Sequence, residues 1–165
     1  MRDTWVEMQS SPTCFRYTDW LVTVPLLIVE FYCVLKATTR CDESVFWRLM
    51  TASIVMLATG YMGELGLAGS ALAFCISFSS YLYIVYEIFS GECSKLSIAS
   101  NNKAGMKCYN TLRFLLSVCW LIYPVGYLLR GTSYEGVNIT YNLADIVNKG
   151  FFGLAIWAAA KEEQK

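Results

Sequence analysis

The sequence predicts an all-α integral membrane protein, a single bundle of five transmembrane helices that takes up residues 1–165. Its composition is 56% hydrophobic and 16% charged, with a mean hydropathy of +0.43, a balance typical of membrane proteins. Five apolar segments each have about the 20 residues that a hydrocarbon core of ~30 Å requires, and polar turns without strand alternation connect them. These segments are residues 15–37, 45–63, 67–89, 109–130 and 139–160.

The charge and residue inventory excludes several classes of function. The 13 basic and 13 acidic residues cancel, so bulk electrostatics do not indicate a nucleic-acid partner. The chain has no histidine, and its seven cysteines form no CxxC pair, so we expect neither a metal site nor a disulfide framework. Any proton chemistry must therefore depend on carboxylates.

The distribution of lysine and arginine predicts the orientation in the membrane. One side of the expected bundle has only Arg2 and Arg130. By the positive-inside rule the other side is cytoplasmic, which places the amino terminus outside and the carboxyl terminus inside. The basic residues on the predicted cytoplasmic side are Lys36, Arg40, Arg48, Lys95, Lys103, Lys107, Arg113, Lys161 and Lys165.

The fifth segment has two opposite charges within an apolar run, Asp145 and Lys149. An isolated charge at the centre of a membrane helix costs about 2.5–3.5 kcal/mol on insertion scales, so such residues are functional candidates. Residues four apart share one helix face, which we expect to point inward. Desolvation favours the neutral lysine amine, which can attack a carbonyl. Lys149 is therefore a candidate covalent anchor; the alternative is an ion pair that only holds helices together.

The first segment has four polar residues at helical spacing, Arg16, Asp19, Thr23 and Glu30. Their offsets of 0, 3, 7 and 14 allow all four to point into the bundle. Asp19 and Glu30 are about 16 Å apart along a helix, with Asp19 nearer the outside and Lys149 between them in depth. This arrangement outlines a proton relay. The alternatives are that Glu30 is a surface carboxylate and that Arg16 and Asp19 form a structural pair.

Two further carboxylates lie near the ends of predicted helices. Glu64, in the stretch YMGELG, is close to the outer end of the second segment, and Glu87 is at the inner end of the third. We interpret Glu64 as an interfacial carboxylate and expect Glu87 to be solvated.

The fourth segment combines a proline with aromatic residues. Pro124 removes a helical hydrogen bond and crowds the preceding turn, which predicts a kink. Trp120, Tyr123 and Tyr127 form a stripe at helical spacing, which can wall a flat apolar ligand or pack as core. The residues alone favour core.

Taken together, RYTDWLVTVPLLIVEFY, YMGE, WLIYPVGY and YNLADIVNKGFFGLAIW resemble the microbial rhodopsins over nearly the whole chain. The pattern is specific: Arg-Tyr-x-Asp-Trp, with Thr four and Glu eleven residues after the Asp, precedes a distant Asp-x-x-x-Lys. The resemblance implies a retinal-binding, light-driven outward proton pump of a bacterial inner membrane, not an enzyme, and a homo-oligomer.

The resemblance also implies roles for the charged residues. Lys149 would carry all-trans retinal as a protonated Schiff base, and Asp19 and Asp145 would form its counterion, with Asp19 as primary proton acceptor. Arg16 would organise the outer half of the site, and Thr23 would hydrogen-bond near Asp19.

Further implied positions lie at the retinal and on its cytoplasmic side. Glu30 would return a proton to the Schiff base from the cytoplasmic side. Leu27 is similar to the residue that distinguishes green-absorbing from blue-absorbing members, and leucine there implies green. The remaining expected pocket residues are Trp20, Trp120, Tyr123, Pro124 and Tyr127, with Met56 and Phe74 as less firm matches.

The chain departs from the family pattern in one respect. The family has seven helices, and this chain is expected to begin in the approach to the third, without the histidine that pairs with the primary acceptor. One rival function is a photosensor that binds retinal but signals through a partner. Glu30 disfavours the sensor, because fast reprotonation serves pumping more than signalling. A second rival is a chromophore-free bundle in which Asp145 and Lys149 merely pair.

Overall fold

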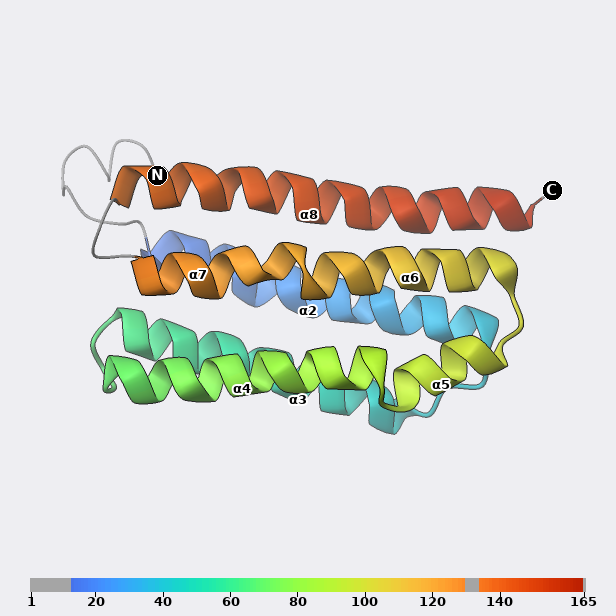
Figure 1. Ribbon diagram of the computed structural model, residues 1–165, viewed down its shortest axis with the longest axis horizontal. Helices are drawn as coiled ribbons and strands as arrows, with labels where there is room; N and C mark the ends of the chain where they lie inside the picture. The colour runs from blue at the N-terminus through green and yellow to red at the C-terminus, as the bar shows by residue number, and fades with distance from the viewer. Residues whose placement is uncertain (1–12, 130–133, 165) are drawn as a thin grey trace.

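The computed structural model describes residues 13–129 and 134–164, which form a bundle of helices that run side by side (Figure 1). These described residues contain no strand. The elements are α2 (Thr13–Thr38), α3 (Glu43–Glu64), α4 (Ser70–Phe89), α5 (Glu92–Ala99), α6 (Lys103–Ser117), the 3₁₀ helix η1 (Cys119–Leu121), α7 (Ile122–Leu129) and α8 (Tyr134–Glu163).

Five helical stretches are long and apolar enough to cross a membrane, which confirms the predicted all-α fold with five spans. The outward faces of the bundle expose large apolar side chains, such as Leu128 at 65% and Ile146 at 71%. Such exposure would be unfavourable in water and is the expected surface in lipid. The spans are Thr13–Thr38, Glu43–Glu64, Ser70–Ala99, Lys103–Leu129 and Gly136–Glu163.

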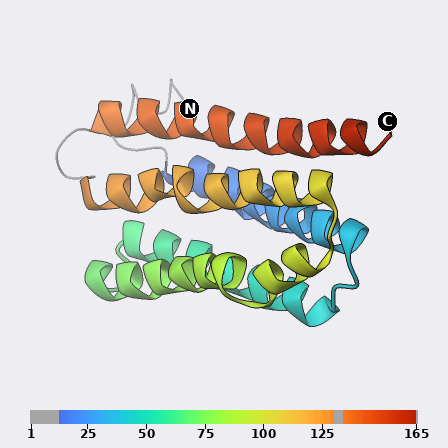
Figure 2. The same ribbon diagram turned by 45° about the vertical axis from the view of Figure 1, so that its right-hand side comes forward.

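The α8 helix lies along one edge of the bundle, and α3 and α4 lie side by side at the opposite edge (Figure 1 and Figure 2). The most apolar stretch of α8 is only 17% buried within the bundle, compared with 28% or 33% for the other spans. The α2 and α6 helices lie between these edges (Figure 2). Residues of α8 that face inward therefore meet α2 and the α6–α7 span.

Helix α5 lies within the segment that was expected to be a polar connection. Its Cys93 and Ser97 side chains are buried, so this short helix packs on the bundle instead of crossing solvent as a loop. Helix α6 also begins at Lys103, six residues before the predicted boundary at 109. The Asn102 side chain accepts a hydrogen bond from the Gly105 N–H at 2.8 Å, an N-cap that starts the helix early.

The fourth span is interrupted just before Pro124, where the proline was expected to disturb the helix. Because Pro124 has no N–H and its ring crowds the turn before it, α6 ends at Ser117 and η1 follows. Two tyrosine hydroxyls donate hydrogen bonds to backbone carbonyls at this interruption. Tyr81 donates to the Ser117 carbonyl, and Tyr141 donates to the Tyr123 carbonyl at 2.9 Å. The break is thus held from α4 on one side and α8 on the other.

Glu87 was expected to be solvated, and this expectation is wrong. Its side chain is buried, with the Arg48 Nη1 atom at 3.2 Å, the Tyr83 hydroxyl at 3.1 Å and the backbone N–H of Glu92 at 3.2 Å. Arg48 also pairs with Glu92. Helix α5 folds over the end of α4 and covers Glu87, which the helical spacing of α4 alone does not indicate.

Candidate functional site

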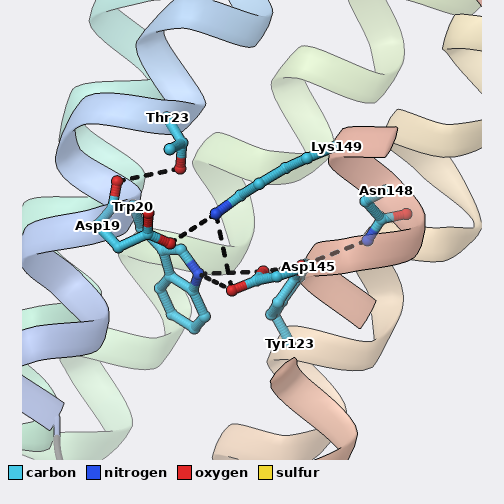
Figure 3. A network of polar contacts seen from close by, with 7 residues as sticks. All are labelled: Asp19, Trp20, Thr23, Tyr123, Asp145, Asn148 and Lys149. Carbon is cyan, nitrogen blue, oxygen red and sulfur yellow. Dashed lines mark hydrogen bonds and ion pairs between the residues drawn. The ribbon is translucent and has the colours of Figure 1, made fainter. Parts of the chain in front are cut away.

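The centre of the site is the amine of Lys149, which lies between two carboxylates (Figure 3). Its Nζ atom is 2.5 Å from Asp19 Oδ2 on α2 and 3.8 Å from Asp145 Oδ2, one turn earlier on α8. The structure therefore brings together residues 130 positions apart in the chain. If all three groups are ionised, this cluster of one cation and two carboxylates has a net negative charge.

The two carboxylates have different surroundings. Asp145 accepts hydrogen bonds from the Trp20 indole N–H at 3.2 Å and from the Tyr123 hydroxyl at 2.5 Å. Among the described residues, the Asp19 carboxylate has the Lys149 amine as its partner. Two neutral donors, one from α2 and one from α7, therefore hold the Asp145 carboxylate in place. Asp19 has fewer hydrogen-bond donors than Asp145 among the described residues.

The expected hydrogen bond of Thr23 near Asp19 is present in a different form. The Thr23 hydroxyl donates to the Asp19 backbone carbonyl at 3.0 Å, as Thr side chains commonly do four residues along a helix. Thr23 therefore contacts the backbone of Asp19 and not its carboxylate.

Arg16 links α2 to α8 one turn before Asp19. Its side chain is buried at 7% exposure, donates to the Asn138 side-chain oxygen, and lies over the Tyr141 ring at 4.6 Å and near the Trp20 ring at 5.8 Å. These contacts hold the Arg16 charge one helical turn from Asp19, toward the N-terminal end of α2.

Glu30 lies away from this cluster, and the expectation that it points into the bundle is not met. Its side chain is exposed, and it has no ion pair or hydrogen bond to residues 13–129 or 134–164. The spacing of 11 residues does put Glu30 on the Asp19 face, but that face flanks the packed stripe of α2. The buried stripe consists of Arg16, Tyr17, Trp20, Val24, Leu27, Ile28, Phe31, Tyr32 and Leu35.

An apolar cavity with Lys149 and Asp145 in its wall extends between the helices. Aromatic rings from several helices line it. The ring centroids of Trp20 and Tyr123 are 5.0 Å apart in an edge contact, and those of Phe74 and Tyr127 are 5.4 Å apart. All the positions expected to contact retinal line this cavity, namely Trp20, Leu27, Met56, Phe74, Trp120, Tyr123, Pro124, Tyr127 and Lys149.

The aromatic stripe of the fourth span therefore forms a cavity wall, although the residues alone favoured core. Trp120 and Tyr127 are buried, as core side chains would be, and they also line the cavity. Helical spacing identifies an inward face but does not show whether that face meets side chains or empty space.

Several cavity residues were not identified from the sequence. Glu64 was interpreted as interfacial, but it lines the cavity and accepts hydrogen bonds from Thr13 at 3.1 Å and Tyr17 at 3.3 Å. Gly60 admits Tyr17, since a Cβ there would lie 2.9 Å from the tyrosine oxygen. The other lining residues missed are Val24, Leu57, Ser77, Phe78, Tyr81, Tyr141 and Asn148. Of these, only Asn148 could have been noticed in the sequence, because it directly precedes Lys149.

Comparison with known proteins supports one family. A model of the bacteriorhodopsin-like proteins matches residues 1–163. The chain is 45% identical to the green-light absorbing proteorhodopsin of Gamma-proteobacterium EBAC31A08 and 43% identical to the blue-light absorbing proteorhodopsin of Gamma-proteobacterium Hot 75m4, in each case over 99% of this chain and 67% of the relative.

Solved structures give the same result. The crystal structure of blue light-absorbing proteorhodopsin from Med12 is 42% identical, with a TM-score of 0.81 over 99% of this chain and 74% of that one. Exiguobacterium sibiricum rhodopsin also has a TM-score of 0.81, at 30% identity over 96% of this chain and 75% of that one. These matches show that the chain belongs to the bacteriorhodopsin-like family of membrane proteins.

Proposed function

We propose that this protein is a light-driven outward proton pump that uses retinal bound to Lys149. The observation that supports this most directly is the Lys149 amine, held between Asp19 and Asp145 in the wall of an aromatic cavity. Relatives named as green-light and blue-light absorbing proteorhodopsins support the same function.

The residues present fit retinal. The cavity is apolar and aromatic along most of its wall, which suits a long apolar chain with one reactive end. Asp145 lies beside Lys149, whereas Glu64 accepts from Thr13 and Tyr17 at another part of the wall. Within the described chain, the other lysines lie toward helix ends, so Lys149 is the mid-span amine. When bound, retinal would supply absorption of visible light and an isomerisation that changes what Nζ faces.

The proton path we propose starts at Lys149 Nζ. Its proton passes to Asp19 Oδ2, at 2.5 Å, which has fewer competing donors than Asp145. Asp145 remains an anion, because Trp20 and Tyr123 donate to it, and balances the positive charge when Nζ is protonated. The buried Arg16 lies on the outer side and favours departure of the proton in that direction.

Glu30 is proposed as the group that returns a proton to Nζ. It lies about 16 Å along α2 from Asp19, at 1.5 Å per residue, toward the proposed cytoplasmic end. Its exposed carboxyl can take protons from the aqueous side. The net direction, from Glu30 through Lys149 to Asp19, is outward.

The membrane setting follows from the charges and the family. We propose a multi-pass protein of a bacterial inner membrane, with the carboxyl terminus in the cytoplasm and the chain assembled as a homo-oligomer. Leu27, buried in the cavity wall, supports green absorption through the family resemblance.

The test is to express the chain in bacterial membranes and add all-trans retinal. A visible band, followed by acidification of the medium on illumination that an uncoupler abolishes, is the expected result. A band without acidification would favour a photosensor. The absence of any band would favour a bundle in which Asp145 and Lys149 only pair.

A further inference from the structure

We propose that Asn148 is a positioning residue that acts through Tyr123 to keep Asp145 from taking the proton of Lys149, so that the proton goes to Asp19. This inference rests on the proposed function of the same site. It concerns the choice between two carboxylates that both lie within 4 Å of one amine.

The hydrogen bonds connect Asn148 to Asp145 through one tyrosine. The Asn148 Nδ2 atom is 3.3 Å from the Tyr123 hydroxyl oxygen, and that oxygen is 2.5 Å from Asp145 Oδ1 (Figure 3). An ionised carboxylate has no proton to give, so the tyrosine proton must lie toward Asp145. The Asn148 amide then has to donate to Tyr123, which determines which way the amide points.

The other end of the same amide supports this orientation. Asn148 is only 2% exposed, and its Oδ1 atom is buried with no hydrogen-bond partner in the described structure. In Figure 3 the nitrogen points toward Tyr123 and the oxygen points away. Buried polar atoms are rarely left unpaired, because desolvation without a partner is unfavourable. The unpaired oxygen is consistent with an amide held in place for its donor end.

The donor end of Asn148 strengthens the hold on Asp145. A hydroxyl that accepts one hydrogen bond becomes a better donor in the next, so Asn148 makes Tyr123 a stronger donor to the carboxylate. Without Asn148, Asp145 is less stabilised as an anion and competes with Asp19 for the proton on Nζ. The proton transfer is then divided between the two acids.

Infrared difference spectroscopy of the retinal-loaded chain tests this division. On illumination the parent should show one new carboxylic-acid band that Asp19→Asn removes. Asn148→Leu should add a second band that Asp145→Asn removes, and Tyr123→Phe should do the same. Asn148→Leu should add nothing further in the Tyr123→Phe background. The matched control is Asn142→Leu, an exposed asparagine on the same helix. A single Asp19 band in Asn148→Leu would overturn the proposal.

A second measurement needs no retinal. In protein labelled with ¹⁵N-asparagine, the side-chain amide signal of Asn148, identified by its loss in Asn148→Leu, should shift in Tyr123→Phe, and that of Asn142 should not. An unchanged Asn148 signal would overturn the proposal even if the chain pumps. A shifted signal in a chain that forms no visible band would instead count against the proposed function alone.

Discussion

Two clusters in this molecule have the same composition, one basic residue and two carboxylates, but they differ in the burial of one carboxylate and in whether they border the cavity. At the predicted cytoplasmic end, Arg48 pairs with Glu87 and Glu92, which we call the inner cluster, and the Glu87 side chain is only 6% exposed. In the middle of the bundle, Lys149 lies between Asp19 and Asp145, whose side chains are 39% and 18% exposed. In the first cluster one carboxylate, Glu87, is buried, whereas Arg48 and Glu92 are 39% and 41% exposed. The second cluster borders a cavity.

The basic residue accounts for much of this difference. Arginine remains protonated and offers several donors in a rigid plane, so Arg48 can hold two carboxylates from different helices. A lysine amine can lose its proton and react, and its flexible stem lets it change partners. Packing around the inner cluster is also tight, since a Cβ at Gly91 would lie 2.3 Å from Glu87 Oε2. We therefore expect the Lys149 cluster to affect function and the Arg48 cluster to affect the stability of the fold.

The largest expected effect is on the mid-span lysine. Lys149→Ala should abolish the covalent visible band, and Lys149→Arg should too, because arginine keeps the charge but not the nucleophilic amine. The control is Lys161→Ala, which removes an exposed lysine from the last turn of α8. Absorption spectra with and without hydroxylamine measure the outcome. A hydroxylamine-sensitive band in Lys149→Ala would show that another lysine is the anchor.

Next in size is the loss of the proposed acceptor. Protonation of Asp19 removes negative charge beside the Lys149 amine and helps its positive charge to delocalise into retinal, so acid should shift the absorption of the parent to the red. Asp19→Asn should hold the red form at every pH and stop transport. A spectrophotometric titration decides this. If Asp19→Asn still titrated like the parent, the acceptor role would pass to Asp145.

A smaller effect is expected at Glu30. Glu30→Gln should leave the colour nearly unchanged, because this carboxyl lies about 16 Å along the helix from Asp19. Return of the proton to Lys149 should slow markedly, depend steeply on pH and recover when azide is added. Flash photolysis measures these rates, with Glu43→Gln as the control at another exposed inner-end carboxyl. A parent-like rate independent of pH would make Glu30 a bystander and favour the sensor.

The inner cluster should affect stability and not colour. Arg48→Met leaves Glu87 buried without its cation. The free energy of unfolding should fall by about 3 kcal/mol, the low end of the range for buried ion pairs, because Arg48 is partly exposed. Unfolding in detergent gives this value, and Arg48→Met with Glu87→Gln should recover part of it. The exposed pair of Lys107 and Glu162 is the comparison, where Lys107→Met should cost less than about 1 kcal/mol. Equal losses of stability in Arg48→Met and Lys107→Met would show that burial of Glu87 does not make its ion pair more important than an exposed one.

The smallest expected effect is on Cys41, which lies between α2 and α3. Burial raises the pKa of the Cys41 thiol, and the negative charges of Glu92 and Asp42 raise it further. A raised pKa means less thiolate at neutral pH, so alkylation of Cys41 should be slower than that of a free thiol and should continue to accelerate above the usual pKa. Glu92→Gln should modestly speed the reaction. An unchanged rate would mean that the charge of the inner cluster does not reach Cys41.

The sequence by itself determined the number of spans and the residues of the charged centre. Twenty-residue apolar runs are a direct requirement of the bilayer, and charges within them are rare enough to be noticed one by one. The spacing of Asp145 and Lys149 likewise follows from the helix repeat. The comparisons confirm the fold and the family.

Only the tertiary structure decided which faces have neighbours. Asp19 and Glu30 share one face of α2, but only Asp19 meets Lys149, because the Lys149 side chain extends from α8 to α2 at that position. Glu87 is buried because α5 folds over it. The role that we propose for Asn148 depends on its contact with Tyr123 on α7. Helical periodicity shows which residues share a face of one helix. Whether that face is buried, and which side chains it contacts, depends on the neighbouring helices.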